Sequence, residues 1–541
     1  MNKYIYFNGI VSGIRTPKGR QMAKIQEDDC IHYEYMKELI GNPNGALAAM
    51  SDSGIIAFGK RGAEIRDAIS GITEWEDEAV YETAGWNGDC FVYPDGRVFA
   101  PTGVQPGNPI FNCETERFAS NGTLSGWLDE VAGPLAGQVV CEFMLGTMFA
   151  GPLRAFGEQS INPGFNLSGT NQDGKSSLVT VMASACGYPS TSGGNGYGLS
   201  FAGTDNGIEW EMQNYADLTM IIDEAALFGF GMSKTARGRA LIDISMRLAE
   251  GREKYRYKVL SRRFRFNYVS TSNDDLIDMI ADSGASQEMI DAVASRFLAL
   301  PLKGRPHGIF DHLPPPYLTI SDFVGPLLRA ADRHHGHAMP HFLAGLVNLI
   351  AEDREGFRAR FDYHLQQFRE QAAAANPRKA SRRTLQAFSL VYAAMRLAQH
   401  LGALPETFSP LQSTLACYNL HVNATLPPPR PMEVVAGLLR DSSVMVLKRG
   451  RDGRLSDRKF SKTKAFRMNK ANGDVEFLMT GDVAEELFAN WSTVRKTDKD
   501  IRKLLVREGD RYDTYRNVRK SQRDRMVCIR LRARSPLLTQ A

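Results

Sequence analysis

The 541-residue sequence predicts an α/β protein built around a phosphate-binding-loop (P-loop) NTPase core, with a β-rich or α+β N-terminal domain, a helical region and a C-terminal winged-helix domain. Three observations lead to this fold class. A G-x-x-x-x-G-K-S pattern opens an amphipathic segment, two later apolar strands end in polar residues, and the last fifth of the chain is strongly basic. Together they indicate a nucleotide-binding core joined to a module for a polyanion.

Length and composition describe several globular domains. The chain is too long for one ordinary hydrophobic core, and 43% hydrophobic with 23% charged residues is typical of a folded globular protein. The seven cysteines are scattered and form no C-x-x-C pair, which favours reduced thiols over a disulfide or zinc framework. No apolar stretch has the length and lack of charge of a signal peptide or a membrane span. We therefore expect a cytoplasmic protein with no membrane segment.

Basic residues are concentrated at one end of the chain. From residue 431 on, 26 lysines and arginines face 15 acidic residues, a net charge of +11, whereas the preceding 430 residues carry a net charge of −7. A basic module on a mildly acidic body is typical of a protein with a polyanionic partner at that end. A solvated basic surface is the alternative interpretation.

The order of patterns along the chain predicts four parts. Residues 1–120 hold short alternating runs between turn residues, which predicts a small β-rich or α+β domain. Strand and helix patterns alternate through 121–310, the predicted P-loop core, and helical periodicity dominates 311–425, a helical lid region. The LPPPRP segment, Leu426 to Pro431, is the clearest linker and opens the basic winged-helix-like part, 426–541.

The phosphate loop lies between a short apolar strand and a helix. A loop of this kind holds phosphates because its backbone N–H groups and the positive end of the following helix face the anion. In this arrangement Lys175 would pair with the β- and γ-phosphates of ATP, and the Ser176 hydroxyl would bind Mg²⁺. Asp173 is an unusual carboxylate for such a loop. The predicted nucleotide-binding residues are Gly169, Thr170, Asn171, Gln172, Asp173, Gly174, Lys175, Ser176 and Ser177.

Two further strands end in residues that complete an ATP site. The continuous apolar run Leu218 to Ile222 predicts a strand buried on both faces, and Asp223 and Glu224 follow it. We expect Asp223 to reach the Mg²⁺ shell and Glu224 to polarise the water that attacks the γ-phosphate. The FRFNYV segment predicts a third strand, after which Thr271 or Asn273 would hold that water.

Basic segments predict the nucleic-acid contacts. GDVAEELFANW and TDKDIRKLLVREG resemble two helices, and YRNVRKSQRDRMVCIRLRA resembles a basic hairpin, which is the order of a winged-helix domain; such domains also serve as protein contacts. GREKYRYKVLSRRFRF interleaves basic and aromatic residues, as single-stranded DNA sites do. The predicted nucleic-acid contacts are Lys254, Arg256, Arg502, Lys503, Arg516, Arg519, Lys520 and Arg523.

With these residues in view, the chain resembles the mobile-element ATPase family catalogued as domain of unknown function 927, whose relatives include helicases of staphylococcal cassettes and pathogenicity islands. The resemblance runs from about residue 80 to the C-terminus. Its motifs are GWNGDCFVYPDG at 85–96, FAGPL at 149–153, TDNGIE at 204–209, IIDE, GREKYR at 251–256, SRFLALP at 295–301 and GIF at 308–310. The loop departs from the family, because GTNQDGKSS stands where relatives have small residues and a threonine.

The resemblance implies an AAA+-type ATPase core, a ring assembly, most simply a hexamer, and DNA unwinding or loading at a replication origin. Any priming activity would come from a separate protein. In ring ATPases a neighbouring subunit supplies an arginine to the γ-phosphate. The candidates are Lys254, Arg256, Arg262, Arg263 and Arg296, of which similarity to family positions favours Arg296.

Two classes of function are therefore in competition. The first is a Mg-ATP-driven ring motor that acts on single-stranded or forked DNA for a mobile genetic element. The second is an ATP-dependent switch or scaffold in mobile-element maintenance or defence, which binds DNA or a partner protein without unwinding. A small-molecule P-loop kinase is disfavoured, since it needs neither the basic C-terminal part nor the long helical segments.

Overall fold

The structure is a computed structural model. It describes residues 6–17, 19–111, 113–192, 194–201, 205–225, 231–252, 262–376, 380–425, 431–441, 443–447, 454–488, 491–508 and 511–539. The chain divides into two compact units, residues 1–366 with 382–417, and residues 367–381 with 418–541. Within the described ranges, no helix combines the length and the apolar character needed to cross a membrane.

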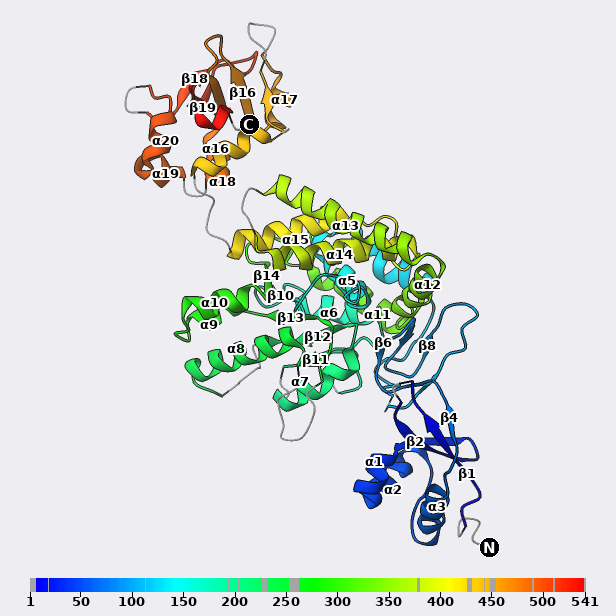
Figure 1. Cartoon of the computed structure of the whole chain (residues 1–541). Coiled ribbons are helices and arrows are strands. Elements are labelled where there is room, and N and C mark those ends of the chain that lie inside the picture. The colour runs from blue at the N-terminus through cyan, green and yellow to red at the C-terminus, as the bar shows by residue number, and fades with distance from the viewer. Residues whose placement is uncertain are drawn as a thin grey trace. The chain divides into compact units, whose positions relative to one another are not determined.

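The N-terminal domain is a small mixed sheet with helices on one face (Figure 1). The sheet has the order β3-β2-β1-β4, antiparallel except for the parallel pair β1 and β4. Alternation along β2 buries Ala23 and Ile25 against Ile65 and Ile69 of the third helix. Its elements are β1 Ile10–Arg15, β2 Gln21–Glu27, β3 Cys30–Tyr35, α1 Met36–Gly41, α2 Pro43–Ala49, η1 Met50–Ser53, α3 Lys60–Ser70 and β4 Trp75–Asp77.

Short strands and helical turns connect this domain to the core. β5 and β9 pair in parallel, and β6, β7 and β8 form an antiparallel meander. Trp86 on β6 donates its indole N–H to the carbonyl oxygen of Pro152 at 2.8 Å, which attaches the meander to the core. The elements are β5 Val80–Tyr81, β6 Gly85–Asn87, β7 Cys90–Val92, β8 Val98–Phe99, β9 Asn108–Pro109, α4 Leu124–Gly126, η2 Trp127–Ala132 and η3 Gly133–Leu135.

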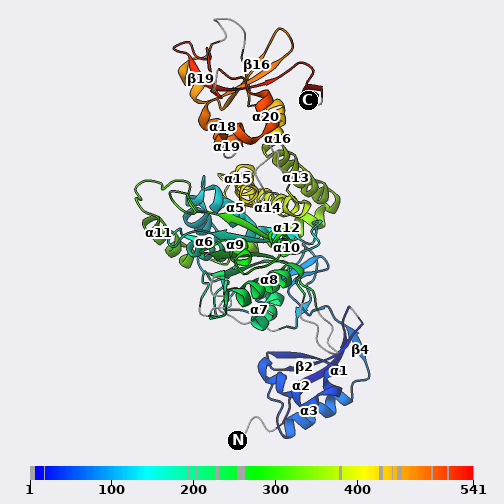
Figure 2. The same cartoon turned by 90° about the vertical axis from the view of Figure 1, so that its left-hand side faces the viewer.

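A five-stranded parallel sheet forms the centre of the core. Its order is β11-β12-β13-β10-β14, with helices on both faces (Figures 1 and 2). The strands β10, β12 and β13 are buried along their whole length, as is usual for the central strands of a parallel sheet covered on both faces. The elements are α5 Val139–Leu153, β10 Gly164–Ser168, α6 Lys175–Ala183, β11 Leu199–Ser200, α7 Asp205–Glu211, η4 Met212–Tyr215, β12 Thr219–Asp223, α8 Lys234–Glu250, β13 Asn267–Ser272, α9 Leu276–Ala281, α10 Gln287–Ala294 and β14 Phe297–Pro301.

The third strand begins later than the sequence predicts. FRFNYV, Phe264 to Val269, is the expected strand, whereas β13 runs from Asn267 to Ser272 and so includes Thr271. The polar residues at its end are accommodated because Ser270 donates to Asn166 Oδ1 at 2.7 Å and Asn166 in turn donates to Ser272 at 2.9 Å. A polar strand end that is satisfied by a neighbouring strand costs little to bury.

A run of helices follows the core in the chain. α14 packs against α5 (Figure 2), and α5 in turn packs on β12 and β13. A capping box between Thr319 and Asp322 begins α11. The helices are α11 Ile320–Arg333, α12 Ala338–Glu352, α13 Arg354–Ala375, α14 Arg382–His400 and α15 Pro410–Thr425. Of the predicted linker, residues 426–430 lie outside the described ranges, and Pro431 begins the next helix.

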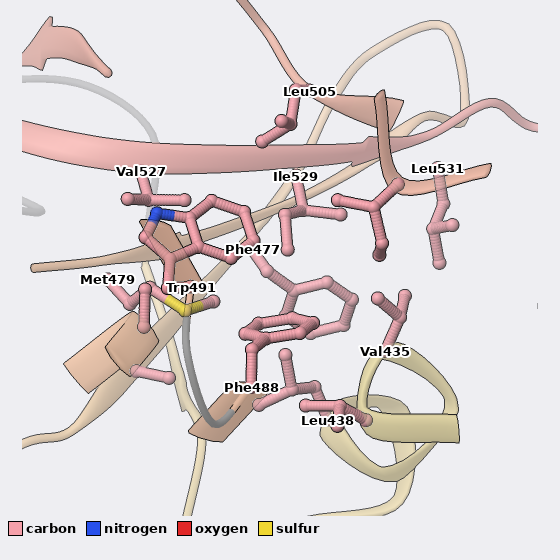
Figure 3. Packing of buried hydrophobic residues seen from close by; sticks show 14 of the residues in the cluster. Val435, Leu438, Phe477, Met479, Phe488, Trp491, Leu505, Val527, Ile529 and Leu531 are labelled. Atoms are coloured by element: carbon pink, nitrogen blue, oxygen red, sulfur yellow. The ribbon is translucent and has the colours of Figure 1, made fainter. Parts of the chain in front are cut away.

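The C-terminal region contains a five-stranded sheet of order β15-β16-β17-β19-β18. Helices cover one face, where Phe477 and Ile529 pack against Val435, Phe488 and Trp491 (Figure 3). The basic hairpin predicted from the sequence is present as β18 and β19, which pair antiparallel. The elements are α16 Pro431–Arg440, β15 Met445–Val446, α17 Asp457–Ser461, β16 Ala465–Asn469, β17 Val475–Met479, α18 Gly481–Phe488, α19 Trp491–Thr497, α20 Lys499–Leu504, β18 Thr514–Arg516, β19 Asp524–Leu531 and α21 Pro536–Thr539.

Candidate nucleotide site

The candidate site lies at the carboxyl edge of the central sheet, where β10 passes through the predicted phosphate loop into α6. The loop is tightly turned. Gln172 and Gly174 both take positive φ angles, 71° and 83°. Turns of this kind aim successive backbone N–H groups into one concavity, and the first turn of α6 adds its own. The backbone is therefore shaped to receive an anion.

The structure explains how a carboxylate fits into the loop. Asp173 folds back across it and accepts a hydrogen bond from the Thr170 hydroxyl at 3.0 Å. A Cβ atom at Gly169 would lie 2.5 Å from Asp173 Oδ2, so only glycine leaves room for this arrangement. The backbone carbonyl of Asp173 accepts from Ile309 N at 3.0 Å, which braces the loop from outside. Asp173 thus stabilises the loop through hydrogen bonds of its side chain and its backbone carbonyl.

Lys175 is the first residue of α6 and is buried. Its Nζ donates to the carbonyl oxygens of Gly169 at 3.0 Å and Thr170 at 2.7 Å. Burial lowers the pKa of Lys175, and the nearby carboxylates Asp173 and Asp223 only partly offset that effect. The ammonium group is therefore held at the loop with less solvent than an ordinary lysine has, which strengthens its attraction for an anion.

Asp223, the last residue of β12, collects three hydroxyl groups. Thr271 and Ser176 donate to its Oδ1, the latter at 3.4 Å, and Thr191 donates to Oδ2 at 3.2 Å. Carboxylate and hydroxyl oxygens are the protein ligands that suit Mg²⁺. Ser176 and Asp223 were predicted for this role and lie together, whereas Thr191 was not identified from the sequence.

Glu224 follows Asp223 in a strained turn. Its φ angle is 61°, and its backbone N–H donates to Asp223 Oδ1 and to Thr271 Oγ1, both at 3.0 Å. A positive φ at a glutamate is costly and persists only where the surroundings impose it. The turn leaves the Glu224 side chain exposed at the carboxyl edge, and the exposed Asn273 follows β13 at that same edge. All the residues predicted to act on the γ-phosphate within one chain are thus brought to one edge of the sheet.

Apolar side chains pack beside the loop. Leu178 and Val181 of α6 lie with Ile309 and Leu327 around a small gap, and all four are buried. The Ile309 side chain also packs against the loop, 3.0 Å from the position of a Cβ atom at Gly174. This packing supports the loop and the start of α6 from the side of the protein interior.

Arg296 lies at the opposite, amino edge of the sheet. It immediately precedes β14, whose Phe297 pairs with Gly164 at the start of β10, while the loop follows the end of β10. Arg296 and Arg383 of α14 lie together beside a shallow pocket. The buried Nε of Arg296 has no hydrogen-bond partner among the described residues. Burial and the neighbouring Arg383 lower the pKa of Arg296.

The predicted nucleic-acid contacts divide into four groups. Arg502, Lys520 and Arg523 are exposed, and Lys503 is an exposed residue paired with Asp500 at 2.9 Å. Arg516 is half-buried beside Cys528. The guanidinium of Arg519 is held internally, since it donates to Asp524 at 2.7 Å and to Asp457 at 3.4 Å. Lys254 and Arg256 lie outside the described residues.

Comparison with known proteins supports the family recognised from the motifs. Residues 34–236 match the family described as Domain of unknown function (DUF927). The match begins at residue 34, whereas the resemblance recognised from the motifs begins at about residue 80. It ends near the start of α8. No curated protein matches the sequence.

Among solved structures, the chain is similar to the one described as "SCCmec type IV Cch - active helicase", with a TM-score of 0.55 and 12% identity over 97% of this chain and 93% of that chain. The protein is therefore a mixed α/β protein similar in fold to a helicase. A structure described as "The A form apo structure of NrS-1 C terminal region-CTR" gives a TM-score of 0.26 and 8% identity over 71% and 83% of the two chains. A TM-score this low carries no weight for the fold.

Proposed function

We propose that this protein is an ATP-dependent, ring-forming DNA helicase or translocase that serves the replication or loading step of a mobile genetic element. The observation that carries the proposal is the convergence of Lys175, Asp223 and Glu224 at one edge of a parallel sheet, in a chain with the fold of a helicase.

The loop and its surroundings fit Mg-ATP. The backbone N–H groups of the loop and of α6 would hold the phosphates, and Lys175 would move from the loop carbonyls to the β- and γ-phosphates. Ser176 and Asp223 would hold Mg²⁺, which when bound neutralises charge on the phosphate oxygens.

Glu224 is the proposed general base. Its exposed carboxylate at the carboxyl edge would accept a proton from the attacking water, while Asn273 would orient that water. The backbone hydrogen bonds from Glu224 to Asp223 and Thr271 keep the two carboxylates in fixed relation. The strained turn thus serves to separate a metal-binding carboxylate from a catalytic one.

A second copy of the chain would complete the site with Arg296. The residue lies one strand length from the loop of its own chain, and its Nε faces no acceptor among the described residues. Arg296 lies beside the exposed Arg383, and two neighbouring guanidinium groups are suited to an incoming polyphosphate. This requirement for a neighbour favours a closed head-to-tail ring, for which we propose a hexamer.

DNA would contact the C-terminal winged-helix-like region and the segment around Lys254 and Arg256. In the C-terminal region the exposed basic residues are the ones that could contact phosphates. Among them, Lys520 and Arg523 lie in the connection between β18 and β19. Arg519 is a poorer candidate, because its charge is already balanced by two carboxylates. Phosphate contacts of this kind position a protein on DNA without reading sequence.

The decisive experiment measures ATP hydrolysis without DNA, with single-stranded DNA and with a fork, together with strand displacement on the same fork. A motor predicts hydrolysis that DNA stimulates, and displacement that Lys175→Ala and Glu224→Gln both abolish. Hydrolysis indifferent to DNA, with no displacement, would favour the alternative of an ATP-dependent switch or scaffold. Absence of hydrolysis under every condition would contradict both.

DNA affinity as a function of salt tests the C-terminal surface. The double variant Lys520→Ala, Arg523→Ala should bind forked DNA more weakly. The slope of log affinity against log salt should fall by about one to two, because each cation that neutralises a phosphate adds roughly one to it. Lys464→Ala is the matched control, since Lys464 is an exposed lysine of the same sheet that pairs with Glu486. An unchanged slope in the double variant would indicate that this turn binds a protein.

A further inference from the structure

A loop outside every recognised motif contacts the metal-binding carboxylate. Thr191 lies 32 residues before Asp223 and donates its hydroxyl to Asp223 Oδ2 at 3.2 Å. The opposite oxygen, Oδ1, accepts from Thr271, Ser176 and the backbone N–H of Glu224. Within the described residues, Thr191 is the one donor to Oδ2, so it alone restrains that side of the carboxylate.

The loop that carries Thr191 is built to hold it in place. Tyr197 N donates to the carbonyl of Tyr188 at 2.9 Å, and Gly198 N donates to the carbonyl of Ser190 at the same distance, which closes the loop on itself. A Cβ atom at Gly198 would lie 2.7 Å from Thr191 Cγ2, so the threonine packs directly against a residue that must be glycine. The position of Thr191 is therefore set by its own loop.

The same loop is also joined to the strand that ends at Asp223. Directly after the loop, β11 pairs in parallel with the end of β12, Ser200 opposite Asp223. Phe201 N then donates to the backbone carbonyl of Asp223 at 3.1 Å. The side chain of Asp223 thus accepts a hydrogen bond from Thr191, and its backbone is paired with the residues at and just after β11.

We infer that Thr191 is a positioning residue for the Mg²⁺ site: it holds Asp223 Oδ2 so that Oδ1 stays turned toward Ser176. The inference rests on the proposed function and adds a residue to it. A carboxylate with donors on both oxygens cannot rotate about its Cβ–Cγ bond without breaking one of them, and a fixed orientation lowers the cost of binding a cation with strict octahedral geometry. Thr191 does not touch the nucleotide in this arrangement, so its loss should weaken metal binding more than nucleotide binding.

The test is a Mg²⁺ titration of the binding of a fluorescent ATP analogue to the full chain, with kcat and KM measured beside it. Thr191→Val keeps the shape of threonine and removes the donor. We expect its apparent Mg²⁺ affinity to fall about three- to tenfold, the usual effect of one hydrogen bond, with analogue binding in EDTA unchanged. Thr191→Ser restores the donor and should recover wild-type affinity. Ser192→Ala, a change of an exposed side chain in the same loop, is the matched control.

A second variant tests whether a loss of Mg²⁺ affinity in Thr191→Val is caused by the introduced valine and not by the missing hydrogen bond. Gly198→Ala leaves Thr191 in the sequence but pushes it from its place, and should show the same Mg²⁺ defect. Wild-type Mg²⁺ affinity in Thr191→Val, or a defect that Thr191→Ser fails to repair, would overturn the inference while the wild-type chain still binds Mg-ATP. A wild-type chain with no Mg²⁺-dependent binding would overturn the proposed function as well, so the two failures are distinguishable.

Discussion

The two edges of the central sheet differ in chemistry, although the same five strands form both. At the carboxyl edge lie Lys175, the carboxylates of Asp223 and Glu224, and three hydroxyl groups that all donate to Asp223. At the amino edge lie arginines: Arg154 follows α5, Arg265 precedes β13 and Arg296 precedes β14. In a parallel sheet the residues that follow the strands all lie at one edge and the residues that precede them lie at the other. The two sets of polar residues are therefore kept apart.

Of these three arginines, Arg296 has the weakest set of partners within the described ranges. Arg265 donates to both oxygens of Asp217, at 2.9 and 3.1 Å, and Arg154 donates to the carbonyl of Ile161 and to Asn162. Arg296 donates to Ala292 O at 2.7 Å and, at 3.5 Å, to Ser295 Oγ. Since β14 holds five residues, the two edges are roughly 16 Å apart. Arg296 is thus too far from the phosphate loop of its own chain to act there, which is why we propose that it serves the loop of a neighbouring chain.

The largest effect is expected at Arg296. Arg296→Ala should lower kcat for ATP about a thousandfold or more, because a trans arginine stabilises charge only in the transition state, while nucleotide affinity changes little. Steady-state hydrolysis and analogue binding measure the two quantities. Arg382→Ala is the control, since Arg382 is an exposed arginine of the neighbouring helix with a 3.5 Å pair to Glu158. An equal loss of kcat in Arg296→Ala and Arg382→Ala would contradict a specific role of Arg296 in hydrolysis.

Glu224→Gln should lower kcat by about a hundredfold to ten-thousandfold, the usual contribution of a general base, and leave Mg-ATP binding intact. Single-turnover hydrolysis and equilibrium binding check this. Asp274→Asn removes another exposed carboxylate of the same edge and should remain close to wild type. Full turnover in Glu224→Gln would contradict its assignment as the base.

Lys175→Ala should weaken Mg-ATP binding about ten- to a hundredfold, because a partly desolvated ammonium makes strong hydrogen bonds to phosphate. A fluorescence titration gives the affinity. Lys303→Ala, at an exposed lysine just beyond β14, should bind as wild type does. If Lys175→Ala and Lys303→Ala weakened Mg-ATP binding equally, the loss would reflect the overall charge of the protein and not a contact made by the loop lysine.

The smallest effect is expected at Asp275, a carboxylate of the same edge that caps α9 and accepts from Ile277 N at 2.8 Å. Burial raises its pKa above the ordinary 3.8, so the folded state binds the proton more tightly than the unfolded state. Asn caps equally well, and Asp275→Asn should match wild type within about 1 kcal/mol at pH 7. As the pH falls toward 3.8, wild type should gain on the variant.

Thermal unfolding of both proteins between about pH 7 and pH 4 checks this sign. A wild type that loses stability relative to Asp275→Asn on acidification would show that the carboxylate is stabilised by its partners, contrary to the direction expected. Asp275→Ala, which lacks the cap, should cost about 1 kcal/mol and reports the capping contribution separately.

Much of the carboxyl edge could be predicted from the sequence, because its chemistry is tied to local patterns. A glycine loop before a helix and an apolar strand before Asp223 and Glu224 each leave a signature within about ten residues. That they meet follows from parallel strand order. The phosphate loop itself could be predicted from the identities of its residues. The hydrogen bond between Thr170 and Asp173 could not, since it depends on the space that Gly169 leaves.

Thr191 and the amino edge lacked any such signature. Thr191 reaches Asp223 through a glycine-rich loop whose sequence predicts only turns, and the contact exists because β11 pairs with β12. Arg296 was singled out by resemblance alone, and the surroundings of its Nε depend on α10 and α14. Arg519 was expected to meet phosphate, yet Asp457 and Asp524, distant and near in sequence, balance its charge.

The most direct test of the account is complementation between two inactive chains. Lys175→Ala lacks a working loop and Arg296→Ala lacks the trans arginine, so each protein alone should hydrolyse almost no ATP. If they are mixed before assembly, sites with an intact loop from one chain and Arg296 from the other should form, and hydrolysis should rise well above the sum of the two. A mixture that never exceeds that sum, at any ratio, would contradict the claim that the two edges of the sheet meet in one active site.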